Sequence, residues 1–434
     1  MKSELARKVF RNVNLVDGDS AAKPGHGVVV EGNRIAEVGP VSSIAIRPGD
    51  EVYDLEGRTL MPGMTQGHWH GSYENIPFIP RPGGLEHHPS YMAFLALKNA
   101  QLALAHGYTS LIGAATGECL DAQLKRAIND GVVEGPRITA CGHWLITTGD
   151  VGDYDEHWWW GISALGVQRI CDGPEEFAKS VRQEIKEGAE VIKIFSDQGH
   201  LLREGGMRFI TMTKAETAAV VDTAHSRGAK VRSHICSKQG ILDGIELGID
   251  LFDHADGLDQ ESLDKMLAAG RYMCPSIRLP QAVVQHFAAA TQQRAFNAEV
   301  REAFESMSRM LVIAAKAGLK VMVGDDWGTW LTPHGDYGTE LKLYAEIGIP
   351  AIEIIRWATK HPAQFVGMER QLGKIAPDML ADLLVVDGDP LADIAILADR
   401  NNILAVMKDG KFYRSSLTPQ TGAAHQRTQR VANS

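Results

Sequence analysis

Two histidines, His68 and His70, stand one residue apart at the end of an apolar run that starts at Thr59. In a β-strand, residues i and i+2 face the same side, so both imidazoles can bind one metal ion. Imidazole is the commonest side-chain metal ligand, although histidine pairs of this kind also occur by coincidence. The pair alone is therefore weak support for a metal site.

A single lysine, Lys193, lies inside the apolar run Val191–Phe195. A buried ammonium group is costly unless it is paired or chemically altered. Two interpretations follow. Lys193 forms an internal ion pair, or its deprotonated amine captures carbon dioxide as a carbamate, whose two oxygens can bridge two cations.

Polar side chains close three further apolar runs. His234 and His254 close two of them, and the pair Asp325 and Asp326 closes the third. Taken singly, each is explained by a structural histidine or a helix-capping aspartate. Barrel enzymes, however, collect their active-site residues at the carboxyl ends of the strands. Together these residue types therefore predict one polar site built from the ends of five strands.

The scaffold for such a site is visible from about Met61, where apolar runs alternate with amphipathic helical patterns. This alternation is typical of βα units around a parallel sheet. The apolar runs are Thr59–His70, Tyr108–Gly113, Arg137–His143, Val191–Asp197, Lys230–Cys236, Asp250–His254, Arg271–Ser276 and Lys320–Asp326. Eight runs favour a (β/α)8 TIM barrel, and an open doubly wound sheet is also compatible with them.

Helical patterns separate these runs. The predicted helices include Tyr91–Ala105, Glu175–Glu187, Lys214–Ser226, Gln260–Ala269 and Ala303–Ala317, with Ala351–Gly367 as the last barrel helix. Several end at a glycine just before the next run, where a left-handed C-cap is needed. The glycines in question are Gly107, Gly228, Gly270 and Gly318.

Short strand patterns with turn residues flank the barrel on both sides. We predict that residues 1–60 and 369–418 together form a small β-sandwich domain, split by the barrel of residues 61–368. Residues 419–434 are polar and form a tail.

The net charge of the chain indicates which kind of molecule it binds. The chain has 434 residues with 44 Lys plus Arg and 54 Asp plus Glu, so its formal charge is 44 − 54 = −10. This acidic balance argues against nucleic acid and favours a small-molecule substrate.

The amino terminus lacks the apolar stretch of a signal peptide, and no window approaches the roughly 20 apolar residues of a membrane span. The five cysteines are widely spaced without a C-x-x-C pair. A cytoplasmic protein with reduced thiols is therefore predicted.

Several motifs carry a family resemblance. They are Leu60–Met64 followed by His68 and His70, Val191–Ile194 around Lys193, Ser233-His234, Asp253-His254, Gly324–Asp326 and the closing segment Ala381–Asp387. With these motifs the sequence resembles the amidohydrolase superfamily, in the branch that includes imidazolonepropionase-like enzymes and Xaa-Pro dipeptidases (prolidases). The resemblance runs from about residue 8 to residue 415.

The resemblance implies two divalent metal ions, assigned as zinc, and N6-carboxylation of Lys193. The implied ligands are His68, His70, Lys193 and Asp326 for one ion, and Lys193, His234 and His254 for the other. A hydroxide that bridges the ions would attack the substrate carbonyl, and Asp326 would deliver its proton to the leaving amine. The family usually has Thr or Ser where this chain has Asp325. Asp325 therefore competes with Asp326 for the ligand role.

The sequence departs from the family pattern where a substrate should bind. Prolidase-like members tend to carry Thr-Gly-Gly-His-Gly after the third strand, and this chain has Val151 in the histidine position, which weakens a dipeptidase assignment. All tryptophans except Trp357 lie at or beyond the ends of runs one, three and eight. They favour an aromatic pocket for a bulky apolar group, with a packed lid or a subunit contact as the alternative. The candidate substrate contacts are His143, Trp158, His200, Arg278 and Trp327.

We therefore predict a hydrolase that cleaves a peptide-like, N-acyl or aryl amide bond of a small substrate with a bulky apolar or aromatic group. The alternatives are a cyclic amide or lactone hydrolase, a deaminase, and a non-catalytic scaffold. Lys193 argues against a deaminase, because deaminases of this superfamily typically use one metal and lack that lysine. The complete set of ligands argues against a scaffold. A homo-oligomer is compatible with the resemblance.

Overall fold

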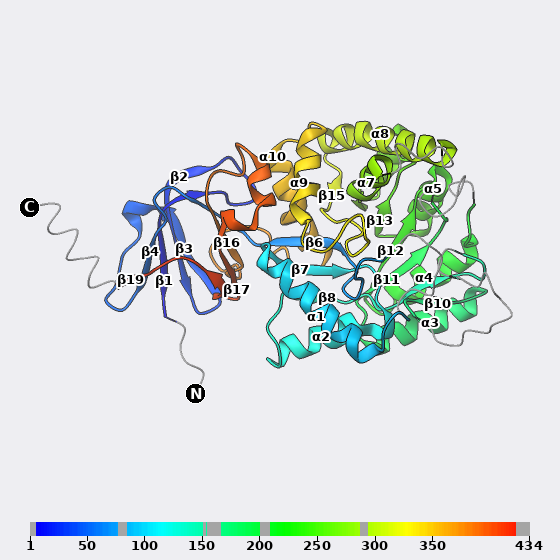
Figure 1. Cartoon of the computed structure of the whole chain (residues 1–434), viewed down its shortest axis with the longest axis horizontal. Coiled ribbons are helices and arrows are strands. Elements are labelled where there is room, and N and C mark those ends of the chain that lie inside the picture. The colour runs from blue at the N-terminus through cyan, green and yellow to red at the C-terminus, as the bar shows by residue number, and fades with distance from the viewer. Residues whose placement is uncertain are drawn as a thin grey trace, which may run out of the picture. The chain divides into compact units, whose positions relative to one another are not determined.

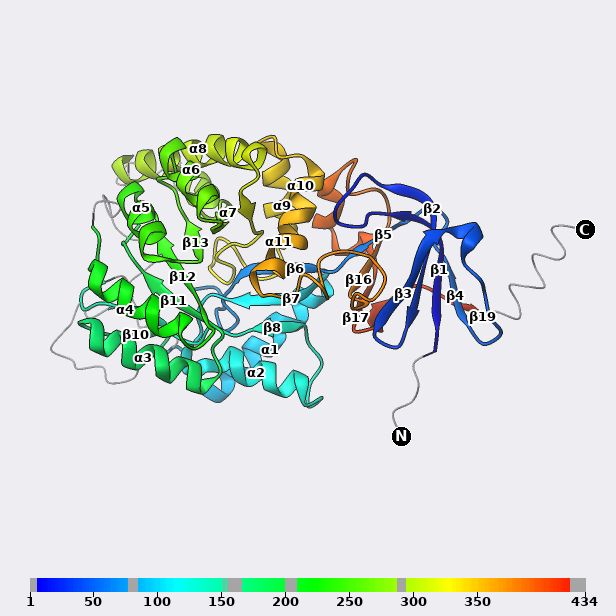
Figure 2. The ribbon, with the colours of Figure 1, turned by 180° about the vertical axis from the view of Figure 1, so that it is seen from behind.

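The computed structural model describes residues 6–76, 85–150, 153, 166–199, 209–286 and 294–421. The chain divides into two compact units. The first comprises Met1–Thr65, Ala103–Ser110 and Pro350–Ser434, and the second comprises Gln66–Leu102 and Leu111–Ile349. Figures 1 and 2 show the ribbon from opposite sides, with the blue amino-terminal and the orange to red carboxyl-terminal strands in the first unit. Within the described residues, no helix is both long and apolar enough to cross a membrane.

The first unit contains one nine-stranded sheet to which both ends of the chain contribute. Its strands run in the order β18-β17-β16-β5-β1-β2-β3, β4 pairs with β1, and β19 pairs with β4. The strands are β1 (Lys8–Leu15), β2 (Lys23–Glu31), β3 (Arg34–Pro40), β4 (Glu51–Asp54), β5 (Thr59–Pro62), β16 (Leu383–Val386), β17 (Ile403–Lys408), β18 (Lys411–Ser415) and β19 (Gln420–Thr421). The antiparallel pairing of β16 with β5 joins the two chain ends.

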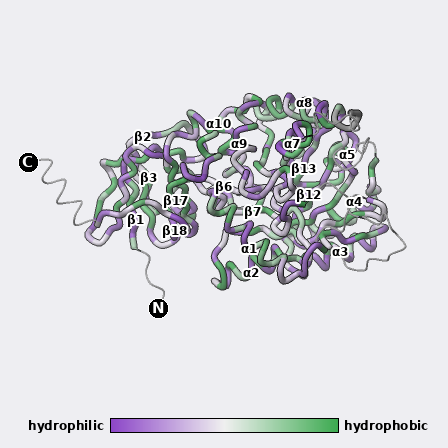
Figure 3. The backbone as a smooth tube through the Cα atoms, viewed as in Figure 1, coloured by the Kyte–Doolittle hydropathy of each residue, from purple (hydrophilic) through white to green (hydrophobic). Residues whose placement is uncertain are grey.

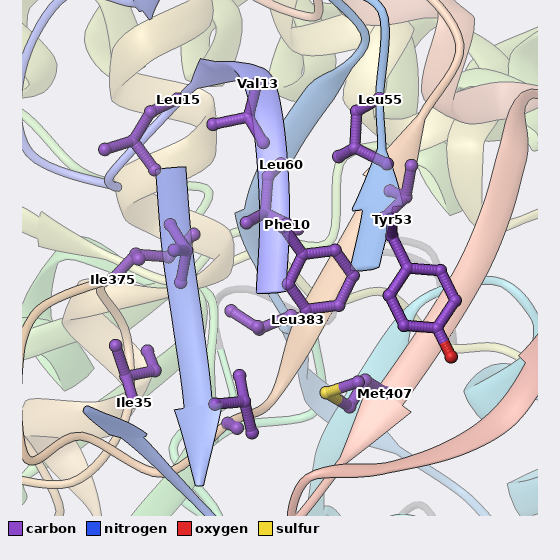
Figure 4. Packing of buried hydrophobic residues seen from close by; sticks show 14 of the residues in the cluster. Phe10, Val13, Leu15, Ile35, Tyr53, Leu55, Leu60, Ile375, Leu383 and Met407 are labelled. Atoms are coloured by element: carbon purple, nitrogen blue, oxygen red, sulfur yellow. The ribbon is translucent and has the colours of Figure 1, made fainter. Parts of the chain in front are cut away.

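Alternating side chains of these strands form the core of the first unit. Phe10 of β1 stacks on Tyr53 of β4 with 5.3 Å between the ring centroids. Leu60 of β5 and Leu383 of β16 belong to the same buried cluster, as Figure 4 shows. Burial of such side chains typically stabilises a fold by about 1.5–3 kcal/mol each. The sheet is therefore held together by residues far apart in the sequence.

The tight turn between β17 and β18 requires a glycine. Gly410, between β17 and β18, has φ +72°, and a Cβ there would lie 2.0 Å from the carbonyl oxygen of Gly32. Gly410→Ala should lower the free energy of unfolding by about 2 kcal/mol or more, because it adds an overlap to a left-handed backbone. Gly25→Ala is the matched control, since Gly25 has φ +69° with nothing within 4 Å of its Cβ position. Equal urea denaturation midpoints for the two variants would contradict the expected overlap.

Two further sheets belong to the second unit, except that β6 and β7 begin in the first unit. Seven strands pair in the order β10-β9-β11-β12-β13-β14-β15, all parallel, and three pair in the order β6-β7-β8. The strands are β6 (Met64–Trp69), β7 (Tyr108–Gly113), β8 (Arg137–Thr139), β9 (Trp144–Ile146), β10 (Gln168–Ile170), β11 (Val191–Phe195), β12 (Lys230–Ile235), β13 (Leu251–His254), β14 (Tyr272–Cys274) and β15 (Lys320–Val321). The α/β architecture with parallel strands agrees with the prediction.

Helices follow the strands of the second unit. They are α1 (Pro89–Ala105), α2 (Leu120–Asn129), α3 (Pro174–Glu187), α4 (Lys214–His225), α5 (Lys238–Leu247), α6 (Gln260–Ala268), α7 (Arg278–His286), α8 (Arg294–Ala317) and α9 (Tyr337–Glu346). Hydrophobic and hydrophilic segments alternate along them in Figure 3. The four predicted C-cap glycines all have φ between +65° and +88°, which confirms their left-handed conformation.

Three predicted strands differ from the structure, and one of them is the eighth run, which is a strand only at Lys320–Val321 (β15). The run from Thr59 is not one strand: β5 pairs with β1 and β16 in the nine-stranded sheet, while β6 pairs with β7. The third run stops at Thr139, because Gly142 takes φ +77° and the chain resumes only as β9. A Cβ at Gly142 would lie 2.3 Å from Oε2 of Glu184, so this kink requires glycine.

The predicted last barrel helix is also different. It breaks at Thr359, which has φ −132° and ψ −66°, into α10 (Ala351–Ala358) and α11 (Lys360–Phe365). Pro362 explains the break, because proline has no N–H for a continuous helix but is tolerated in a first turn. Both helices belong to the first unit.

Candidate active site

Four buried histidines gather at the carboxyl ends of β6, β12 and β13. The ring of His68 lies 5.0 Å from that of His70 and 5.4 Å from that of His254, between centroids. The ring of His234 lies 4.4 Å from that of His254. Each histidine is at most 6% exposed. The parallel strands thus bring together residues that are up to 186 positions apart in the sequence.

Asp326 faces three of these histidines. Its Oδ1 lies 3.0 Å from Nε2 of His68 and 3.2 Å from Nε2 of His70. Its Oδ2 lies 3.9 Å from Nε2 of His254. Ligand atoms bound to one metal ion at about 2.0–2.2 Å lie roughly 3 Å apart, so the spacing around Oδ1 suits a shared cation.

Polar groups on the far side of the rings orient His68 and His70 through their Nδ1 atoms. The hydroxyl of Ser276 donates to the carbonyl of Gly324 at 3.2 Å and therefore accepts from Nδ1 of His68 at 3.1 Å. Nδ1 of His70 lies 3.3 Å from the carbonyl oxygen of Ala115, which can only accept. Nε2 of each ring then faces Asp326, so that the two nitrogens and the carboxylate are positioned to bind one cation.

Burial favours the uncharged form of His68, His234 and His254, because it lowers the pKa of each ring. It lowers the pKa of His68 to about 3, against the opposing effect of Asp326. Burial, followed by the nearby His254 and Lys193, lowers the pKa of His234 well below its usual range. Burial alone would raise the pKa of Asp326, but its histidine neighbours hold that pKa well below the usual range. Neutral imidazoles beside an ionised carboxylate are the protonation states that metal binding requires.

Lys193 is buried beside the histidines and forms an ion pair. Its Nζ lies 2.5 Å from Oδ2 of Asp253. Arg232 holds the same carboxylate with two hydrogen bonds, of 2.9 and 2.6 Å. Although burial raises the pKa of Asp253, the charges of Arg232 and Lys193 hold it far below its usual range. The three side chains are at most 1% exposed.

Asp325 has a different environment from Asp326. Its carboxyl group accepts from the backbone N–H of Arg278 at 2.5 Å, at the start of α7, and turns away from the histidines. Burial, followed by Glu340 and Asp326, raises the pKa of Asp325 well above its usual range. The structure therefore places Asp326, and not Asp325, against the imidazoles.

Left-handed backbone surrounds the histidines. His254 has φ +68°, Ala255 has φ +56° and Ser276 has φ +50°. Such conformations cost about 1–3 kcal/mol for residues other than glycine and are concentrated at functional sites. Here they place the ring of His254 and the hydroxyl that orients His68.

The amidohydrolase family model matches residues 59–413. The chain belongs to this family. An ochratoxinase of Aspergillus niger is 26% identical over 424 residues, which cover 92% of this chain and 85% of that protein. The structure of a Xaa-Pro dipeptidase with bound methionine is 27% identical, with a TM-score of 0.84 over 94% of this chain and 100% of the other. A prolidase complexed with N-methylphosphonate-L-proline has the same identity and TM-score, over 95% and 100%. These matches confirm the family resemblance drawn from the motifs.

In this amidohydrolase, His143 is held away from the other histidines. Its Nδ1 lies 3.2 Å from Glu184, and its Nε2 accepts from the backbone N–H of Glu118 at 3.1 Å. Arg169 pairs with the same glutamate at 2.9 Å, and Cys119 lies against it at 3.3 Å. With both ring nitrogens occupied, His143 anchors the start of β9 and offers no nitrogen to a substrate.

Of the other predicted substrate contacts, the structure describes two, Trp327 and Arg278, and they differ in burial. Trp327 is fully buried, with its ring edge-on to Tyr337. Arg278 is half-buried at the start of α7, where its guanidinium lies 3.7 Å from Asp336. Trp158 and His200 lie outside the described residues, as does Val151.

Three residues of the site were missed by the sequence analysis. Arg232 and Asp253 form the buried pair behind Lys193, and Ser276 orients His68. A signal was available for the first two, because each is a charged residue inside an apolar strand, as Lys193 is. Ser276 gave no comparable signal.

Proposed function

We propose that this chain is a metal-dependent hydrolase that cleaves an amide bond of a small substrate with two divalent ions, most consistent with zinc. Membership of the amidohydrolase family and the named relatives support hydrolysis of amide bonds. The observation that carries the metal-dependent part is the meeting of the Nε2 atoms of His68 and His70 with Oδ1 of Asp326. That donor set fits a divalent cation.

The ligand assignment extends this observation. His68, His70 and Asp326 would hold one ion, and His234 and His254 the other. Carboxylated Lys193 would be a ligand of both ions, and its amine would then no longer pair with Asp253 as it does here. When bound, the two ions would lower the pKa of water and polarise the substrate carbonyl. Divalent charge would also offset the ionised carboxylate of Asp326 in this buried region.

Asp326 is the residue best placed to move a proton. It is ionised, and with 18% of its side chain exposed it is more open than the four histidines. A carboxylate in this position can take a proton from the attacking water and deliver it to the leaving amine. The hydroxyl of Thr332 donates to the backbone carbonyl of Asp326 at 2.7 Å and so fixes the segment that carries it.

A closed barrel would hold these residues at one end. We propose that the two sheets of the second unit join into the predicted (β/α)8 barrel, accompanied by a small β-sandwich. Two backbone hydrogen bonds support closure. Gly67 N–H donates to Val323 at 2.7 Å, and Val191 N–H donates to Ala140 at 3.1 Å. They link β6 to the segment after β15, and β11 to the segment after β8.

Metal analysis tests the proposal directly. Protein purified without chelators should contain about two divalent ions per chain, and removing them should abolish hydrolysis until zinc is returned. A screen should include Xaa-Pro dipeptides, N-acyl amino acids and aryl amides, with preference expected for a bulky apolar or aromatic group. Full activity in a metal-free preparation would contradict the proposal. Preference for small polar substrates would reject the aromatic pocket that the tryptophans predict.

A further inference from the structure

Aromatic rings line the histidine cluster on one side. The rings of Trp144 and Phe195 meet edge to face with centroids 4.7 Å apart. Phe195 stacks on His234 at 4.5 Å, and Trp144 meets His70 edge-on at 6.5 Å. Tyr73 stacks on His70 with 4.4 Å between the ring centroids and belongs to the same buried cluster as Trp144 and Phe195. We call Tyr73, Trp144 and Phe195 the aromatic wall. It contacts histidines assigned to both proposed metal ions.

The register of β9 directs Trp144 toward the site. Trp144 is the partner of Lys193 in the parallel pairing of β9 with β11. Residues paired across neighbouring strands share a face of the sheet, so the indole lies on the same side as the Lys193 amine. The backbone of β9 is held at this point, since the N–H of His143 donates to Glu184 at 3.0 Å and that of Trp144 donates to Val167 at 3.1 Å.

The indole N–H of Trp144 has no acceptor among the described residues, although the side chain is only 8% exposed. A buried donor without a partner is costly, and an acceptor atom of a bound ligand would remove that cost. Trp69 and Trp327 also lack acceptors there. Trp69, however, alternates with His68 and His70 along β6 and so faces the opposite side, and Trp327 packs on Tyr337. Trp144 alone among these three contacts the histidine rings.

We propose that Trp144 is a specificity-determining residue, whose indole N–H donates a hydrogen bond to an oxygen of the substrate while its ring packs against the apolar group. The inference rests on the proposed function, because it assumes that an amide substrate occupies the histidine cluster. An amide substrate offers two kinds of acceptor: the scissile carbonyl, and a carboxylate on the amine side, as in an N-acyl amino acid. Both accept from an indole N–H, and the experiment separates them.

The test uses Trp144→Phe, which keeps an aromatic ring and removes the N–H. Two substrates are compared, N-acetyl-L-phenylalanine and N-acetylphenethylamine, which differ only in the carboxylate. A bond to the carboxylate should lower kcat/KM about tenfold or more for the acid and hardly at all for the amine-derived substrate. A bond to the carbonyl should lower kcat/KM for both substrates, with metal content and melting temperature unchanged. Trp357→Phe, the same change in α10 of the first unit, is the matched control and should alter neither substrate.

Unchanged kcat/KM for both substrates would overturn the proposal. So would a loss for both that tracks lost metal or a lower melting temperature, because the role would then be structural. If the wild-type enzyme hydrolyses neither substrate, calorimetric binding of N-acetyl-L-phenylalanine to the metal-loaded protein decides. Weaker binding to Trp144→Phe than to wild type would support the role of Trp144 even then, and equal binding would reject it. Failure of the proposed function and failure of this inference are thereby distinguishable.

Discussion

A Lys193→Ala variant should lose bound metal and nearly all hydrolytic activity. We expect kcat/KM to fall by roughly a thousandfold or more, because loss of a shared ligand removes several kcal/mol of transition-state stabilisation. Lys193 is 1% exposed beside four histidines, so no other described lysine can replace it at this position. Metal content by elemental analysis and initial rates on the best substrate of the screen measure the effect.

The control and the rescue separate a carbamate from a simple ion pair. Lys179→Ala, on the exposed face of α3, should leave both metal content and rate unchanged. If a carbamate is the missing group, formate, acetate or propionate should restore part of the activity of Lys193→Ala by filling the space with a carboxylate. A Lys193→Ala protein that keeps two metal ions and its full rate would rule out the carbamate bridge. The ion pair with Asp253 would then be the whole role of the lysine.

Much of the scaffold could be predicted because its signals are local. The amphipathic pattern predicts a helix over Glu175–Glu187, which begins one residue after the start of α3 and ends at the same residue, where Gly188 provides the left-handed cap. Gly142 shows the limit of local signals. Its kink is set by Glu184, which approaches from α3 and is far away in the sequence. No pattern within the run from Arg137 contains that contact.

The site was predictable to a similar extent. Histidines at strand ends are visible in the sequence because the carboxyl ends of parallel strands meet. Which carboxylate faces them depends on backbone direction at a single peptide, and this separates Asp325 from Asp326. Whether His143 can reach a substrate depends on α3, because Glu184 of that helix occupies Nδ1 of the ring. The pairing of Trp144 with Lys193 depends on strand register, which the sequence does not state.

The buried charges behind the histidines give the second large effect. Asp253→Asn preserves shape but leaves the cations of Arg232 and Lys193 facing each other without a counter-charge. In metal-free protein, where Lys193 is unmodified, we expect the free energy of unfolding to drop by about 3–5 kcal/mol. Urea denaturation of chelated wild-type and variant proteins measures it. Because the two sites interact directly, the loss should be smaller when Asp253→Asn is made in a Lys193→Met background.

The pH dependence identifies the charge as the cause. The pKa of Asp253 is held well below its usual value in the folded state, so its stabilisation is present above the unfolded pKa of about 3.9 and is lost as pH falls through the folded pKa. The stability difference between wild type and Asp253→Asn should therefore stay constant from about pH 5 to 8 and narrow only in stronger acid. A difference that disappears near neutral pH would mean that Asp253 is protonated in the fold. Asp253 would then contact Arg232 and Lys193 through hydrogen bonds and packing, without an ionic attraction.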